Sequence, residues 1–306
     1  MKTAASWLSV LCLVAFIAAR PAAADIAVTD ATGNAVNVPG AGPVISIGGS
    51  VTEIAHALGQ VDRVVAVDST SLYPPAVTEK PDVGYMRQLA AEPILALQPA
   101  LILAVEDAGP PAVLDQIREA GVPVVLVPDE PTPHGVLDKI DIVAAALGVP
   151  AKGDALRAAL RAEVDGLAAK IAKVSERPRV LFMLSIGQGR VPMVAGLDTS
   201  AAGIVELAGG INAVEGFNGY KPLSPEAAVA AAPEVLLITN RSLELLGGEQ
   251  GLLAIPEIAV TPAGQSGQVV AMDGLLLLGF GPRTGKAIRQ LAGHLHPGLS
   301  LRAAAD

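Results

Sequence analysis

Short runs of β-branched residues alternate with segments rich in alanine and leucine along most of the chain. In the first half, strands are expected at 44–47, 63–67, 101–105 and 122–127. Helices are expected between them, at 51–58, 90–97 and 111–120. This alternation predicts an α/β fold with a mostly parallel sheet covered by helices.

The spacing of apolar residues changes between Gly153 and Val174, where they recur on one face of a helix and charges occupy the other. Asp154 near the start and Lys170 near the end suit the helix dipole, and Pro178 prevents continuation. A helix of about 22 residues spans ~33 Å. After it the alternation resumes, with strands expected at 179–184, 235–239 and 269–272.

The two halves repeat a layout of acidic residue, short helix, proline and apolar strand, at 92–107 and 225–241. Any β/α protein contains such units, but the long helix between the halves favours two similar Rossmann-like lobes joined by a single long α-helix. The predicted division is an N-terminal lobe at 25–150, a linking helix at 151–176 and a C-terminal lobe at 177–306. Two lobes imply a cleft, which the loops after the strands should line.

The first 24 residues have the pattern of a secretory signal peptide: a lysine, an apolar run and small residues before the expected cleavage site. Removing residues 1–24 removes the only cysteine and the only tryptophan, so no disulfide or thiolate site is expected. Export without cysteine fits a bacterial periplasm. No later apolar run is long enough to cross a bilayer.

The mature chain is acidic. Without Lys2 and Arg20, 19 of the 21 basic residues remain against 30 acidic residues. There is no basic stripe with interleaved aromatic residues, so a nucleic-acid partner is not expected.

Patterns typical of catalysis are missing from the sequence. The segment 279–287, GFGPRTGKA, departs from a phosphate-binding loop because Phe280 and Ala287 replace the required glycine and hydroxyl residue. The histidines do not cluster, and His134 falls in a proline-rich stretch that reads as a loop. No nucleophile motif or pair of catalytic carboxylates is apparent. Binding without catalysis is therefore the stronger hypothesis.

The segment 81–89, PDVGYMRQL, places one of only three tyrosines two residues before an arginine. In an extended segment, residues i and i+2 project to the same side, so Arg87 can reach the Tyr85 oxygen. A phenolate suits ferric iron, and tyrosine is a known axial haem ligand. Spacing alone leaves open a packed tyrosine beside an exposed arginine.

Five segments together resemble the periplasmic haem-binding proteins of bacterial haem ABC importers: GGSVTEIAHALG, VAVDSTS, PDVGYMRQLAAEPILALQPALIL, YKPLSPE and MDGLLLLGFGPR. The resemblance covers nearly all of the mature chain. It implies a helical-backbone binding protein, monomeric and located in the periplasm, that delivers haem to an inner-membrane permease.

The resemblance also implies roles for particular residues. Tyr85 would ligate the haem iron and Arg87 would hydrogen-bond its phenolate, while Arg241, in the loop after a second-lobe strand, would supply a polar contact. Some members hold two haems with a histidine in the segment that matches FMLSIGQG, but this chain has Ile186 there. Glu92 and Glu206 match the acidic residues that dock on the permease.

A vitamin B12 or ferric-siderophore binding protein of the same fold is the alternative. The stretch SLYPP is shared with B12-binding sequences, so Tyr73 could serve either ligand. The mature chain has no tryptophan to stack on a corrin, and the cleft loops offer few arginines for an anionic chelate.

Overall fold

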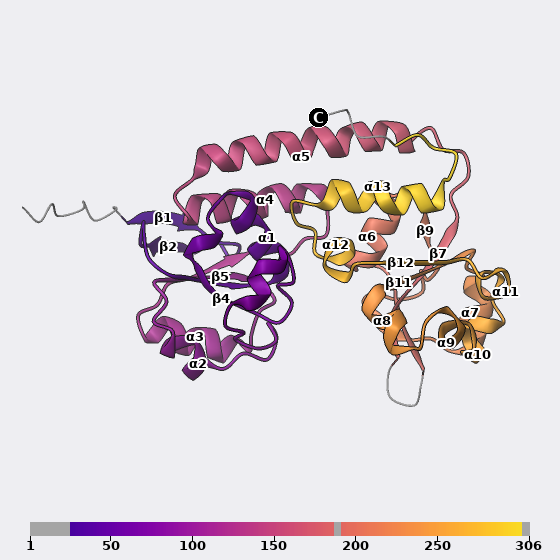
Figure 1. The fold of residues 1–306 in the computed structure, drawn as a ribbon, viewed down its shortest axis with the longest axis horizontal. Helices are drawn as coiled ribbons and strands as arrows, with labels where there is room; N and C mark the ends of the chain where they lie inside the picture. Colours follow the sequence, from indigo (N-terminus) through magenta and orange to yellow (C-terminus); the bar gives the residue numbers. More distant parts are fainter. Residues whose placement is uncertain (1–24, 187–190, 302–306) are drawn as a thin grey trace, which may run out of the picture.

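The computed structural model describes residues 25–186 and 191–301, and the side chain of Ile186 is not among the described parts. The predicted signal peptide at 1–24 therefore lies outside the described residues. Two α/β lobes lie side by side beneath one long helix, α5 (Pro150–Ile171) (Figure 1). The predicted fold class is confirmed. The division of the chain at residues 150 and 176 stays a prediction.

The N-terminal lobe is built on a four-stranded parallel sheet with the strand order β4-β3-β5-β6. All residues of β3, β5 and β6 are buried, because helices cover the sheet. The strands are β3 (Val44–Ile47), β4 (Val64–Val67), β5 (Leu101–Val105) and β6 (Val124–Val127). The helices are α1 (Gly49–Ala57), η1 (Val61–Arg63), η2 (Pro75–Glu79), α2 (Ala91–Ala96), α3 (Pro111–Glu119) and α4 (Pro133–Ala146).

The C-terminal lobe has a mixed sheet with the order β10-β8-β7-β11-β12, and β9 pairs with β7. Its β7, β9, β11 and β12 pair in parallel, whereas β8 pairs antiparallel with both of its neighbours, β7 and β10. The strands are β7 (Arg179–Ile186), β8 (Pro192–Ala195), β9 (Ile211–Asn212), β10 (Tyr220–Pro222), β11 (Val235–Thr239) and β12 (Val269–Met272). The helices are α6 (Ser200–Leu207), α7 (Pro225–Ala231), α8 (Asn240–Leu245), α9 (Glu249–Leu253), α10 (Pro256–Ala259), α11 (Pro262–Ser266), α12 (Gly274–Leu278) and α13 (Thr284–Leu295).

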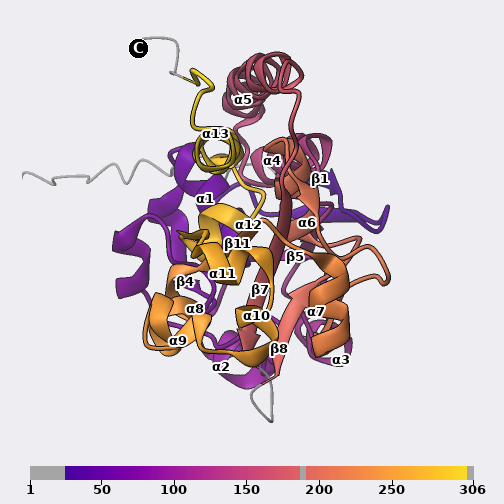
Figure 2. The same ribbon diagram turned by 90° about the vertical axis from the view of Figure 1, so that its right-hand side faces the viewer.

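The long helix α5 packs against α4 of the first lobe and α13 of the second. Figure 2, which looks along α5, shows both helices directly beneath it. Arg289 of α13 donates to Glu163 of α5 at 2.5 Å. The helix thus contacts both lobes along its length. No helix among the described residues is long and apolar enough to cross a membrane.

Several elements were not predicted from the sequence, among them β8, β9 and β10 of the C-terminal lobe. A hairpin of β1 (Ile26–Thr29) and β2 (Ala35–Val38) precedes the sheet, and α4 occupies the stretch that was read as a proline-rich loop. The loop interpretation of His134 is therefore wrong: the residue lies in the first turn of α4. Thr132 caps that helix by accepting a hydrogen bond from the Gly135 backbone N–H.

Candidate functional site

Tyr85 and Arg87 lie on a short irregular segment that crosses the carboxyl end of the N-terminal sheet. Gly84, at φ 94°, turns the chain, and its carbonyl accepts a hydrogen bond from the Ser69 N–H after β4. Met86 is 7% exposed and faces the core, whereas Tyr85 is 40% exposed. The buried Met86 directs its two neighbours outward, away from the core.

The predicted contact between the two residues is present. Arg87 Nη1 donates to the Tyr85 phenol oxygen at 2.7 Å. Arg87 Nη2 donates to Asp107 in the turn after β5. Burial alone would lower the pKa of Arg87, but the hydrogen bond to Tyr85 and the charge of Asp107 raise it above its ordinary value. The guanidinium therefore stays cationic beside the phenol, which can present its oxygen to a hard metal ion.

The Tyr85–Arg87 pair lies on the side of the first lobe that faces the second. Burial raises the pKa of the Tyr220 phenol in β10, and hydrogen bonds from Thr199 and Ala201 oppose the shift, with a smaller contribution from the charge of Arg87. Sequence reasoning missed Tyr220, because the effect of Arg87 on this phenol depends on how the two lobes are placed.

Tyr73, the other predicted tyrosine, is held differently. The Arg283 guanidinium carbon lies 3.7 Å from the centroid of the Tyr73 ring, and the His56 ring lies nearly perpendicular to it, with 6.2 Å between the centroids. Arg283 also forms a bidentate ion pair with Glu53 of α1, whose side chain is only 4% exposed. One face of Tyr73 is thus already covered by a cation from the C-terminal part of the chain.

The Glu53–Arg283 pair joins segments 230 residues apart in sequence. Burial raises the pKa of Glu53, and Arg283 opposes this through its hydrogen bond and charge. Gly281 lies against Ser50 and Glu53, where a Cβ atom would come within 3.2 Å of the carboxylate. The connection between α12 and α13 is therefore fitted closely onto α1 of the first lobe. The stretch GFGPR was singled out in the sequence as part of the family resemblance. The pairing of its arginine with Glu53 could not be predicted from it.

Arg241 lies in the first turn of α8, not in a loop as expected, because Thr239 caps the helix immediately after β11. Arg241 is exposed. Leu245, four residues later and therefore on the same helical face, is 80% exposed. In Figure 1, α8 lies on the side of the second lobe nearest the first. Leu72, beside Tyr73, adds another exposed apolar side chain at 49%.

The two predicted docking residues are both exposed, but they lie in different settings. Glu92 is in the first turn of α2, and Glu206 is in the last turn of α6, a helix that packs against α12 and α13. Glu226, in the first turn of α7, has the same place in the second lobe as Glu92 in the first. Helix α2 leads through a proline into β5, and α7 leads through a proline into β11.

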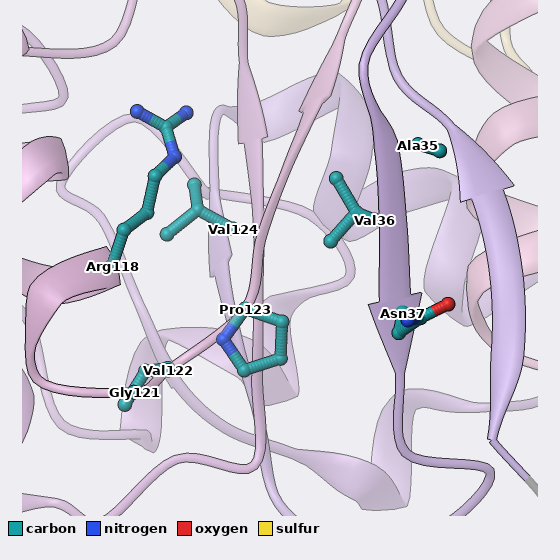
Figure 3. A pocket seen from close by; sticks show the side chains of 8 residues that line it. All are labelled: Ala35, Val36, Asn37, Arg118, Gly121, Val122, Pro123 and Val124. Carbon is teal, nitrogen blue, oxygen red and sulfur yellow. The ribbon is translucent and has the colours of Figure 1, made fainter.

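Two cavities lie away from these residues. One, of 330 Å³, is between β2 and the segment joining α3 to β6 (Figure 3), lined by Ala35, Val36, Asn37, Arg118, Gly121, Val122, Pro123 and Val124. The other, of 260 Å³, lies between α4 and α5. Neither is lined by the predicted site residues. Within the described part of the chain, no group of three or more His, Cys, Asp or Glu residues is arranged to hold a metal ion.

Residues 44–275 match the family model described as "Periplasmic binding protein". The chain belongs to the periplasmic binding protein family. Among solved structures, this periplasmic binding protein resembles the periplasmic heme-binding protein RhuT from Roseiflexus sp. RS-1. The identity is 43%, the match covers 84% of this chain and 98% of RhuT, and the TM-score is 0.81.

A second similar structure is the periplasmic heme-binding protein BhuT in complex with two hemes. It is 41% identical, with 83% of this chain and 98% of BhuT covered and a TM-score of 0.79. By sequence, the chain is also 28% identical to a Vitamin B12-binding protein of Vibrio parahaemolyticus, over 65% of this chain and 71% of that protein. These periplasmic binding proteins are substrate-binding proteins rather than enzymes.

Proposed function

We propose that this protein binds ferric haem between its two lobes, with the Tyr85 phenolate as an iron ligand, and delivers it to the permease of an ABC importer. One observation carries the proposal: an exposed phenol oxygen accepts a hydrogen bond from a cationic arginine at the carboxyl end of the sheet. A phenolate stabilised in this way is a suitable ligand for ferric iron.

The surrounding residues fit haem as a cargo. Leu72 and Leu245 expose apolar surface that a macrocycle would cover, and Arg241 lies on the same helical face as Leu245. Solved haem-binding proteins resemble this chain at 41–43% identity over more than four-fifths of its length, which supports haem over cobalamin. The protein would act as a monomer in the periplasm after removal of residues 1–24, as a binding protein without catalytic activity.

Vitamin B12 is the second candidate, because B12-binding proteins are among the relatives of the chain. Tyr73 is the residue that both ligands could use, but the Arg283 guanidinium occupies one face of its ring. Parallel titrations of the mature protein with ferric haem, cyanocobalamin and a ferric siderophore separate these functions. We expect haem to bind with a Kd below about 1 µM and at least about 100-fold more tightly than the other two. Tighter binding of cyanocobalamin would make this a corrinoid-binding protein.

We further propose that Glu92 and one glutamate of the second lobe dock on the permease. Glu206 is the candidate from the sequence, whereas Glu226 has the position equivalent to Glu92. Charges at the rim of an interface mainly control encounter and register. Glu92→Lys with Glu226→Lys should abolish haem transport in reconstituted vesicles while leaving haem affinity unchanged.

Glu92→Lys with Glu206→Lys is the matched comparison, since it makes the same change in charge. We expect this second double variant to transport no worse than Glu92→Lys alone. The defect of Glu92→Lys should be weaker than that of the Glu92/Glu226 double variant and should grow with salt, because exposed charges are screened beyond ~10 Å at 0.1 M. If the Glu206 pair abolishes transport and the Glu226 pair does not, Glu206 is the docking residue. Normal transport by both pairs would exclude this docking role altogether.

A further inference from the structure

The Arg87 guanidinium is shared between two oxygen acceptors on different segments. Nη1 donates to the Tyr85 phenol oxygen, and Nη2 donates to Asp107 Oδ2. A guanidinium is planar and its donors point in fixed directions. Holding Nη2 on the carboxylate therefore also determines where Nη1 points.

The backbone fixes Asp107 relative to this arginine. The Gly109 N–H donates to the Met86 carbonyl at 2.9 Å, and the Leu89 N–H donates to the Gly109 carbonyl at 2.9 Å. These two bonds join the turn after β5 to the segment that carries Tyr85 and Arg87. Ala108, next to Asp107, is 5% exposed and anchors the turn in the core.

Arg87 needs such an anchor. Its side chain is 50% exposed, and it projects from a segment without regular secondary structure. A long exposed side chain of this kind loses considerable rotamer entropy when it is held in one orientation. The carboxylate of Asp107 is 35% exposed and offers a charged acceptor where the guanidinium ends.

The charge of Asp107 has an opposing effect. A carboxylate near a developing phenolate disfavours the phenolate, so removing it would by itself strengthen iron binding. Arg87 is in direct contact with the phenol oxygen and separates it from the carboxylate. Because the nearer charge acts more strongly, the loss of orientation should outweigh the relief of repulsion.

We infer that Asp107 is a positioning residue for the haem ligand: it holds Arg87 in the orientation that donates to Tyr85. This inference rests on the proposed function, since the phenolate matters only if it binds iron. Asp107 touches neither the iron nor the phenol in this arrangement and acts through Arg87.

A double-mutant cycle on the haem dissociation rate tests the inference. Asp107→Ala should speed haem loss by about tenfold, the effect expected for one charge-assisted hydrogen bond. Asp107→Asn, which keeps an acceptor oxygen, should change the rate less than about threefold. In an Arg87→Ala background, Asp107→Ala should have no further effect beyond about twofold, because nothing remains to be positioned. Asp115→Ala, which removes another exposed carboxylate from the same lobe, is the control for net charge and should match the wild type.

A second readout does not need haem. In the protein without ligand, the Arg87 Nε–H NMR signal, assigned with Arg87→Lys, should be sharp in the wild type and broadened in Asp107→Ala. An unchanged NMR signal and an unchanged rate of haem loss in Asp107→Ala would overturn the inference. So would an Asp107→Ala effect on the rate of haem loss that is the same in the wild type and in the Arg87→Ala background. If the wild type shows no iron–tyrosinate spectrum, the proposed function fails instead, and the NMR comparison still decides whether Asp107 orders Arg87.

Discussion

Replacing Arg283 with alanine is expected to lower the free energy of unfolding by about 3–5 kcal/mol at pH 8. The Glu53 carboxylate, which is 4% exposed, would lose both donors of its bidentate partner. A buried charge without its partner costs far more than an exposed ion pair contributes. The change would also uncover one face of the Tyr73 ring and loosen the contact between the lobes.

The size of this loss should depend on pH. Burial raises the pKa of Glu53 above its ordinary value of 4.5, and Arg283 is the main group that opposes the shift. Without Arg283 the pKa in the folded state rises further. A carboxyl group whose pKa is higher in the folded than in the unfolded state binds protons more tightly when folded, so stability falls as pH rises from about 4.5 through the folded pKa. Arg283→Ala should therefore lose more stability at pH 8 than at pH 5.

Urea unfolding followed by circular dichroism at the two pH values measures both effects. Arg289→Ala is the matched control, because its ion pair with Glu163 is 28% and 32% exposed and should contribute no more than about 1 kcal/mol. An Arg283→Ala protein as stable as the Arg289→Ala protein, or a loss that is the same at both pH values, would show that Glu53 is not held as a buried charge.

The strands that the sequence predicted best are those buried on both faces. Every residue of β3 and β5 is buried, so the apolar run and the strand coincide. The hairpin β1–β2 has only one buried residue in each strand and thus gave no apolar run to detect. Helix α4 was missed because Pro133 suggested a loop, although proline is common in the first turn of a helix.

At the site, a contact between residues close in sequence could be predicted, and contacts between distant segments could not. The contact between Tyr85 and Arg87 joins residues two positions apart, and it could be predicted. The prediction assumed an extended segment, whereas the chain turns here and the Gln88 N–H donates to the Tyr85 carbonyl. Asp107 and the Glu53–Arg283 pair could not be predicted, because their contacts depend on the packing of distant segments. Asp107 did lie in a loop expected to line the cleft, directly after a predicted strand. A charged residue in that loop was the signal that could have pointed to Asp107 as part of the site.

The central claim is that Tyr85 ligates haem iron, and its loss should have the largest effect on binding. Residues that only support a metal ligand typically change affinity by 10–100-fold, so removing the ligand itself should weaken haem binding by more than about 100-fold. Tyr73→Phe is the matched control, since it removes the same hydroxyl from the other tyrosine of the first lobe.

The most direct measurement is the visible spectrum and affinity of the mature protein with one equivalent of ferric haem, compared among the wild type, Tyr85→Phe and Tyr73→Phe. The wild type and Tyr73→Phe should show high-spin ferric bands with a charge-transfer feature near ~600 nm, and Tyr85→Phe should lose both that feature and the affinity. A Tyr85→Phe protein that keeps the spectrum and the affinity, while Tyr73→Phe loses them, would contradict the assignment of Tyr85 as the iron ligand.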